Sequence, residues 1–262
     1  MNLEVITRQP ASGAHPTPLL FVHGAWHGAW CWDETFLPYF AQHGYASHAL
    51  NLRGHGKSEG RDRLRFTRIS EYAADVAQVA SQLPTPPVVI GHSMGGLVVQ
   101  KYLETHTPPA AVLLASVPPA GVLATTLRIA ARHPLTFLQV NLTWSLYPLV
   151  STLDLCREAF FSKDMPTGKA KEYFAKMQEE SYLGFLDMMI FALPRPKRVR
   201  IPLLVLGATD DTIFHTDEVQ ATARAYNTTA EIFPNMAHDM MLEAGWQAVA
   251  DRIIAWLNER GL

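Results

Sequence analysis

The feature that most constrains this chain is a series of short, continuous apolar runs, separated by longer segments with helical spacing. A strand that is apolar at every position, rather than at alternate ones, must be covered on both faces. This pattern predicts an α/β protein with a mostly parallel, doubly wound sheet and helices on each side. The runs are Leu19–His23, Ala46–Leu50, Val88–Gly91, Ala111–Ala115, Leu203–Gly207 and Ala230–Phe233.

The segments between these runs predict helices. Ala244–Glu259 is the clearest, because its large apolar residues, among them Val249 and Ile253, fall on one helical face before the terminal Gly261. The other expected helices are Asp33–His43, Ser70–Gln82 and Leu97–Thr105.

One long region interrupts the alternation of strands and helices. Residues 120–200 contain no convincing strand and are dense in aromatic residues and Met, which predicts an inserted helical cap. The chain would then consist of a core in two parts, 1–119 and 201–262, with the cap between them. A basic stretch at the end of the cap is interpreted as a solvated linker, with contact to a phosphate or lipid headgroup as the alternative. Its cations are Arg195, Lys197, Arg198 and Arg200.

The composition suits a globular protein and excludes several classes. The chain has 262 residues, 48% of them hydrophobic and 18% charged, which allows a sizeable core and argues against disorder. A net charge of −2 gives no reason to expect a nucleic-acid partner. We expect a cytoplasmic protein without a membrane span, because no secretory signal and no apolar stretch of about 20 residues occur. Cys31 and Cys156 are expected to be unpaired thiols.

The strongest local signal is the sequence Gly91-His92-Ser93-Met94-Gly95. It is a Gly-x-Ser-x-Gly motif that follows an apolar run and precedes a helical segment, the context in which a serine is presented on a tight turn. The two small residues prevent a clash between strand and helix. The start of the helix offers free N–H groups to a developing negative charge. The motif predicts that Ser93 is a nucleophile.

A serine nucleophile needs a base and an acid, which are expected on loops at the same edge of the sheet. His238 follows the last apolar run and is the only histidine beyond His215, which makes it the predicted base. Asp210 and Asp211 follow the preceding run, and neighbouring side chains point apart, so only one can orient the imidazole. We predict that Asp210 does so and that Asp211 is a turn or capping residue.

The loop after the first buried run, His23-Gly24-Ala25-Trp26-His27, is a second part of the expected site. Its Ala25 N–H, together with the N–H of Met94, is predicted to bind the oxyanion of a tetrahedral intermediate. His23 and His27 are interpreted as bracing the loop through ring hydrogen bonds. A metal site is not expected, because no carboxylates accompany them.

Taken together, these motifs resemble the α/β-hydrolase family. The resemblance rests on FVHGAWHGAW (21–30), LRGHGKS (52–58), VVIGHSMGG (88–96), PLLVLGATDD (202–211) and MAHDMMLE (236–243). It implies a sheet of about eight strands with a cap after the sixth, a triad of Ser93, Asp210 and His238, and oxyanion donors at Ala25 and Met94. Only Leu3–Thr7 is a clear strand candidate before residue 18. The segment 21–30 is also similar to plant hydroxynitrile lyases and methyl esterases, but the lyases carry a lysine where Asp239 follows His238.

The resulting functional hypothesis is a serine hydrolase that cleaves an ester or thioester of an apolar small molecule through an acyl-enzyme at Ser93. No cofactor is expected. Trp26, Trp144 and Phe161 are the predicted pocket residues, since the cap is rich in aromatic side chains. Two alternatives remain. The same triad could serve a C–C bond hydrolase, lyase, perhydrolase or acyltransferase, or the chain could be a ligand receptor.

Overall fold

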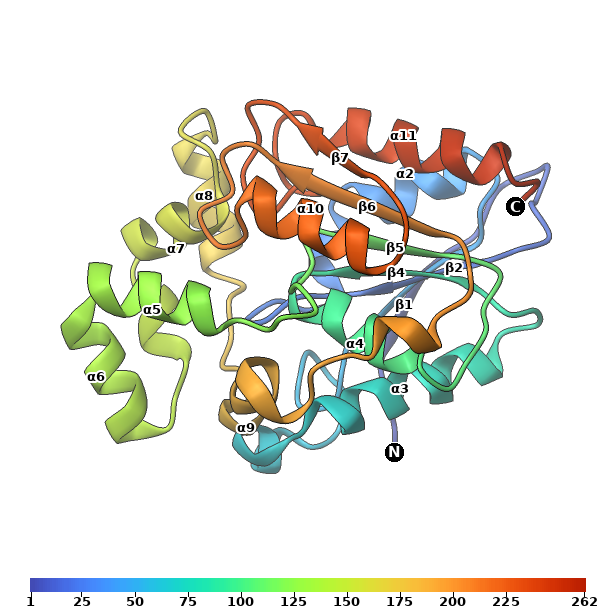
Figure 1. Cartoon of the computed structure of the whole chain (residues 1–262). Helices are drawn as coiled ribbons and strands as arrows, with labels where there is room; N and C mark the ends of the chain where they lie inside the picture. The colour runs from blue at the N-terminus through green and yellow to red at the C-terminus, as the bar shows by residue number, and fades with distance from the viewer.

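A seven-stranded sheet runs through the middle of the computed structural model, which describes residues 1–262 (Figure 1). The strand order is β1-β3-β2-β4-β5-β6-β7, and every neighbouring pair is parallel except β1 with β3. The mostly parallel sheet is therefore confirmed. The strands are β1 (Val5–Arg8), β2 (Leu19–Val22), β3 (Ser47–Leu50), β4 (Val88–His92), β5 (Ala111–Leu114), β6 (Leu203–Ala208) and β7 (Ala230–Phe233).

The sheet has one strand fewer than the family resemblance suggested. Only β1 precedes β2, and it pairs directly with β3 at the edge of the sheet. The segment between β1 and β2 contains Pro10, Pro16 and Pro18 and forms no strand. Proline has no N–H to donate to a ladder, so this segment cannot supply the missing strand.

Both faces of the sheet are buried from β2 to β6, as the continuous apolar runs predict, whereas the edge strand β7 is only half-buried. Leu19 and Phe21 of β2 belong to one apolar core, whereas Leu20 and Val22 belong to the other, because successive side chains point to opposite faces. The first core is covered by α1 (Trp30–Asp33), α2 (Phe36–Gln42) and α11 (Trp246–Asn258). The second core is covered by α3 (Ile69–Gln82), α4 (Met94–Tyr102) and α10 (Thr216–Ala225).

The cap lies between β5 and β6 and contains helices only, which confirms the predicted helical insertion (Figure 1). Its α-helices are α5 (Leu123–Arg132), α6 (Pro134–Thr143), α7 (Leu153–Phe160), α8 (Thr167–Phe174) and α9 (Tyr182–Leu186). Short turns of other helix types are η2 (Tyr147–Val150), η3 (Asp187–Phe191) and η4 (Pro196–Arg198), and the core adds η1 (Arg61–Phe66). None of the helices is both long and apolar enough to span a bilayer.

A buried carboxylate fastens the cap to the core. Glu180, just before α9, accepts a 2.7 Å hydrogen bond from the Tyr72 hydroxyl and lies 3.1 Å from Nε2 of His55. Burial raises the pKa of Glu180, but His55, Tyr72 and the Ser181 N–H lower it by more, so the pKa lies below its ordinary value. The cap is thus held near the sheet edge by a charged group whose partners belong to the core.

Candidate active site

Ser93 occupies a strained turn between β4 and α4. Its φ of 52° and ψ of −120° are unusual for a residue with a side chain. The turn is tight enough to require glycine on either side of it. A Cβ at Gly91 would lie 2.5 Å from the Gly95 carbonyl oxygen, and one at Gly95 would lie 2.4 Å from the carbonyl oxygen of Val22. The motif is therefore explained by backbone packing, which holds Ser93 at the end of the strand.

His238 follows β7 and is fully buried at the same edge of the sheet. Its Nδ1 lies 2.8 Å from Oδ2 of Asp211. Because a carboxylate oxygen can only accept, Nδ1–H donates to Asp211, and Nε2 is the ring nitrogen that remains available to another partner. That Nε2 has no hydrogen-bond partner within the chain. The rings of Phe214 and Phe160 lie 5.5 and 6.1 Å from the imidazole.

The prediction that Asp210 orients His238 is wrong, since the neighbouring Asp211 makes that contact. β6 continues to Ala208, one residue further than expected, and a turn follows before the acid. Oδ1 of Asp211 accepts hydrogen bonds of 2.8 and 3.0 Å from the N–H groups of Ile213 and Phe214. These bonds hold its carboxylate inward, whereas Asp210 is exposed and accepts from the Thr209 hydroxyl.

The loop that carries Ala25 packs directly against Ser93. A Cβ at Gly24 would lie 3.0 Å from Cβ of Ser93 and 2.9 Å from Nδ1 of His92. The Ala25 N–H makes no hydrogen bond within the chain. Met94 is the first residue of α4, where N–H groups have no intrahelical acceptor. Ala25 and Met94 both line one small cavity together with Ser93.

A second buried carboxylate lies behind this loop, at Asp239. Its Oδ2 is 2.9 Å from Nε2 of His27, and Nδ1 of the same ring is 2.7 Å from the Ala25 carbonyl oxygen. Both ring nitrogens therefore face acceptors, so the His27 ring carries two protons. Burial lowers the pKa of His27, but Asp239 and the Ala25 carbonyl raise it by more, so it lies above 6.5. Burial raises the pKa of Asp239, and His27 outweighs this effect, so it lies below 3.8.

The remaining histidines of the site are neutral braces. His23 Nδ1 donates to the Gly24 carbonyl at 2.8 Å, and its Nε2 accepts from the Leu52 N–H at 3.2 Å. His92 Nε2 donates to the His238 carbonyl at 3.0 Å and so joins the turn of Ser93 to the loop of His238. Burial lowers the pKa of each of these two histidines to about 3.

The sequence analysis assigned bracing roles to His23 and His27 but missed Asp239. This carboxylate is 212 residues from His27 along the chain, so no local pattern connects them. Ligand atoms of His92, His238 and Asp239 lie within 4.8 Å of one another, close enough for a metal site. Each of these side chains makes one hydrogen bond within the chain, and one further polar atom of each, His92 Nδ1, His238 Nε2 and Asp239 Oδ1, has no partner.

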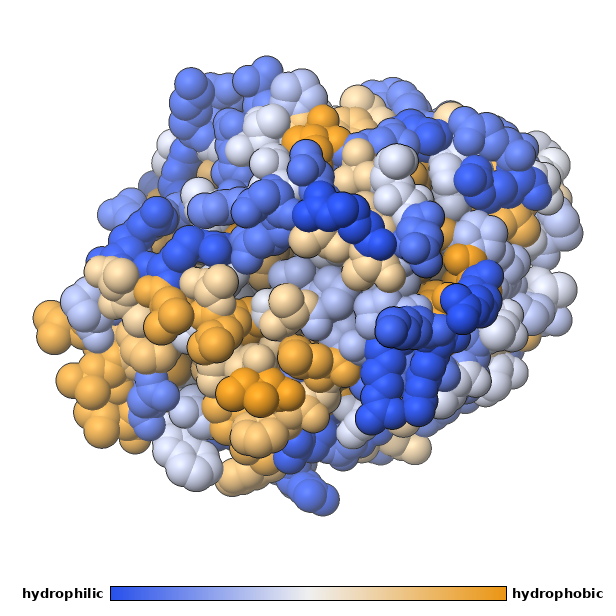
Figure 2. All heavy atoms as spheres, viewed as in Figure 1, coloured by the Kyte–Doolittle hydropathy of each residue, from blue (hydrophilic) through white to orange (hydrophobic).

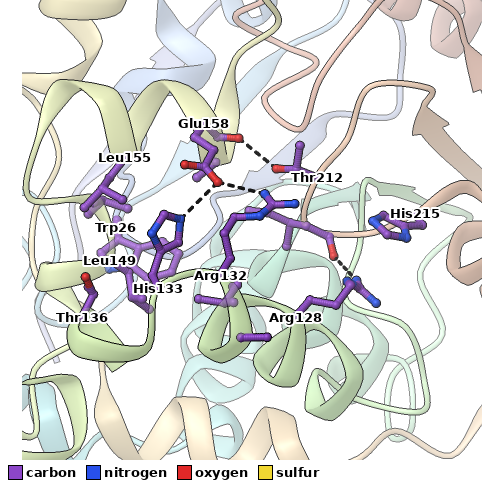
Figure 3. Close-up of a pocket in the computed structure, with 15 residues that line it drawn as sticks. Trp26, Arg128, Arg132, His133, Thr136, Leu149, Leu155, Glu158, Thr212 and His215 are labelled. Carbon is purple, nitrogen blue, oxygen red and sulfur yellow. Dashed lines mark hydrogen bonds and ion pairs between the residues drawn. The ribbon is translucent and has the colours of Figure 1, made fainter. Parts of the chain in front are cut away.

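Two cavities lie between the cap and the sheet edge. The inner one, of about 80 Å³, contains Ser93 and is mostly apolar. The outer one, of about 510 Å³, has a polar side on which Glu158 contacts Arg132 at 2.9 Å and His133 at 3.1 Å (Figure 3). The residues that line both cavities are Trp26, Ile129, Leu149 and Ile213. These four side chains form the boundary between a small space at the serine and a larger space outside it.

Of the predicted pocket residues, the structure places only Trp26 in these walls. Trp144 is 51% exposed and stacks on Tyr182, with 5.5 Å between ring centroids. It ends α6 in a left-handed conformation and lines neither cavity. Phe161 is buried in the core beside Tyr173 and also lines neither. The prediction that these two residues line the pocket is wrong.

Comparison with known proteins agrees with this geometry. A family model described as "Alpha/beta hydrolase family" matches residues 19–252. The chain belongs to the α/β hydrolase family. A non-heme haloperoxidase of Rhodococcus erythropolis is 27% identical over 256 residues, covering 85% of this chain and 86% of that protein. A pyrethroid hydrolase of Sphingobium wenxiniae is 24% identical, covering 75% and 72%.

Solved structures show the same hydrolase fold. The esterase EaEST from Exiguobacterium antarcticum superposes with a TM-score of 0.77 at 18% identity, covering 98% of this chain and 95% of that one. A structure titled as the putative non-heme bromoperoxidase BpoC from Mycobacterium tuberculosis gives a TM-score of 0.80 at 19% identity, covering 99% and 97%. Esterases and haloperoxidases thus share this architecture.

The pair of His27 and Asp239 makes the stability of this α/β hydrolase depend on pH. The raised pKa of His27 stabilises the fold fully below 6.5, and this contribution is lost as pH rises through the folded-state pKa. The lowered pKa of Asp239 stabilises it fully above 3.8, and this contribution is lost as pH falls. We therefore expect Asp239→Asn to lower the free energy of unfolding by about 2 kcal/mol between these values, and by less at higher pH.

Urea unfolding of both proteins across this pH range measures the effect. Asp251→Asn, which changes an exposed carboxylate bonded to Tyr39, is the matched control and should leave the pH dependence unchanged. If the free energy of unfolding of Asp239→Asn differed from that of the wild type by the same amount at every pH, His27 and Asp239 would not form an ion pair.

Proposed function

We propose that this chain is a serine hydrolase that cleaves a carboxylic ester or thioester of an apolar small molecule through an acyl-enzyme at Ser93. The observation that carries the proposal is the state of His238. Its Nδ1–H is held by Asp211, while the unpartnered Nε2 is available as a proton acceptor at the sheet edge that presents Ser93. A base oriented in this way is what a serine needs to become nucleophilic.

The mechanism follows from these positions. His238 Nε2 takes the proton of the Ser93 hydroxyl as its oxygen attacks the ester carbonyl carbon. The N–H groups of Ala25 and Met94 stabilise the oxyanion, each by about 3–4 kcal/mol. Collapse of the intermediate expels the alcohol or thiol, which receives the proton from His238. Water, deprotonated by the same imidazole, then attacks the acyl-enzyme, releases the acid and restores Ser93.

The cavity at Ser93 supports an apolar acyl or alcohol group. Its walls include Val117, Val122, Met188 and Phe214, and no charged side chain contributes to them. The outer cavity adds room for the other half of the substrate beside Trp26. A relative named as a pyrethroid hydrolase is in accord with a bulky apolar ester.

A second candidate function uses hydrogen peroxide in place of water. The relative from Rhodococcus erythropolis is named a non-heme haloperoxidase and covers most of this chain. Attack of hydrogen peroxide on the Ser93 acyl-enzyme would release a peroxyacid, with the proton again taken by His238. Formation of peroxyacid from an ester and peroxide, compared with simple hydrolysis, separates the two functions.

The test of the proposed function is hydrolysis of a series of chromogenic esters by the wild type and variants. We expect Ser93→Ala to abolish turnover. Asp211→Asn should lower kcat by about 10²–10⁴-fold, because the imidazole loses its fixed tautomer. Asp210→Asn is the matched control, changing the neighbouring exposed carboxylate, and should retain a rate close to that of the wild type.

Two results would contradict this proposal. Full activity of Ser93→Ala would exclude the acyl-enzyme. A larger loss in Asp210→Asn than in Asp211→Asn would mean that the acid is not the residue hydrogen-bonded to His238.

The boundary between the cavities should set acyl-chain preference. Ile129→Ala removes a side chain that lines both spaces, so it should connect them and raise kcat/KM for long esters relative to short ones by about tenfold. Leu127→Ala on the same helix is the control, because Leu127 is 63% exposed and lines neither cavity. An equal change in chain-length preference in both variants would indicate a general disturbance of α5. It would refute the role of Ile129 as a boundary between the two cavities.

A further inference from the structure

The cap presents an unusual amount of apolar surface to solvent. The six most exposed large apolar side chains of the whole chain all belong to it, with exposed fractions from 54% to 81%. Figure 2 shows apolar surface gathered at the end of the molecule formed by α5, α6 and the segment around α9. We call these six residues the cap face: Leu127, Leu135, Leu138, Leu142, Ile190 and Phe191.

The segments that form the cap face are also cationic. Residues 123–143 and 188–200 contain six Arg or Lys residues and no Asp or Glu, and three of these cations, Arg128, Arg132 and Arg198, pair with glutamates elsewhere in the chain. Three exposed cations that follow the cap face, Arg195, Lys197 and Arg200, form no side-chain ion pair. Figure 2 shows hydrophilic side chains beside the apolar surface, over the segment that leads from α9 towards β6. The cap face is thus an apolar area bordered by three cations whose side chains have no acidic partner.

Two of the elements that carry the cap face, α5 and η3, also line the Ser93 cavity on their inner side, whereas α6 does not. In α5, Ile129 lines the cavity while Leu127 is exposed to solvent. In η3, Met188 lines the cavity while Ile190 is exposed. Each element therefore has the catalytic cavity on one side and the cap face on the other.

We propose that the cap face docks on an anionic lipid surface, with its leucines and Phe191 in the interface and the cations against lipid phosphates. Apolar side chains bordered by Lys and Arg bind at such surfaces through burial and through attraction to anionic lipids. A second copy of the chain fits less well. A symmetric dimer would place the same patch on itself and bring the two cationic edges together.

Docking does not depend on the proposed ester hydrolysis. It would bring the cavities beneath the cap close to esters dissolved in a bilayer, but the lipid contact itself uses no catalytic residue. Ser93→Ala should therefore bind vesicles as the wild type does. Loss of vesicle binding would therefore count against docking alone, and absence of ester hydrolysis would count against the proposed function alone.

Flotation with vesicles tests the proposal. The probes are vesicles of phosphatidylcholine alone and of phosphatidylcholine mixed with increasing phosphatidylglycerol. We expect binding to rise with the anionic lipid and to fall with salt. Leu135→Ser/Leu142→Ser and Lys197→Glu/Arg200→Glu should each lower the partition coefficient by about tenfold. Both variants change exposed side chains, so thermal stability and hydrolysis of a water-soluble ester should be unchanged.

The matched control is Lys163→Glu/Lys169→Glu, at and just before α8, on the side of the cap away from α9 (Figure 1). It changes the net charge by the same amount and should bind nearly as the wild type does. Absence of vesicle binding would overturn the proposal, as would equal losses in the control and in Lys197→Glu/Arg200→Glu. A concentration-dependent dimer that Leu135→Ser/Leu142→Ser abolishes, without vesicle binding, would overturn it in favour of a second copy.

Discussion

The strained backbone of Ser93 is the constraint on which the rest of the site depends. Its positive φ persists only because β4 and α4 meet at Gly91 and Gly95 with no space for a Cβ on either glycine. That close packing requires a sheet that is buried on both faces. The continuous apolar strands and the strained turn of Ser93 are therefore two consequences of one arrangement, in which a rigid centre holds a residue in an unfavourable backbone conformation.

Buried carboxylates then join loops that are far apart in the sequence to the turn of Ser93. Asp211 fixes the tautomer of His238, Asp239 braces the loop of Ala25 through His27, and Glu180 fastens the cap. All three carboxylates are buried, where each would be costly without its partners. Their contacts hold His238, the loop of Ala25 and the cap near Ser93.

Much of this could be predicted from the sequence, because the decisive signals were local. Strand composition indicated the parallel sheet, and glycine spacing indicated the turn of Ser93. The choice between Asp210 and Asp211 depended on where β6 ends, a boundary that shifts by one residue with little change in pattern. The role of Asp239 depended on a contact across most of the chain. Trp144 points outward because it ends α6 in a left-handed conformation, and the spacing of apolar residues in the sequence does not indicate such a helix end.

The central claim is that His238 activates Ser93, and reaction with a fluorophosphonate tests it most directly. The reagent forms a covalent bond only with an activated serine, and intact-protein mass spectrometry followed by peptide mapping locates the bond. We expect a single modification at Ser93 that forms rapidly in the wild type and much more slowly in His238→Ala. Modification at another serine, or an equal rate at Ser93 in both proteins, would contradict it.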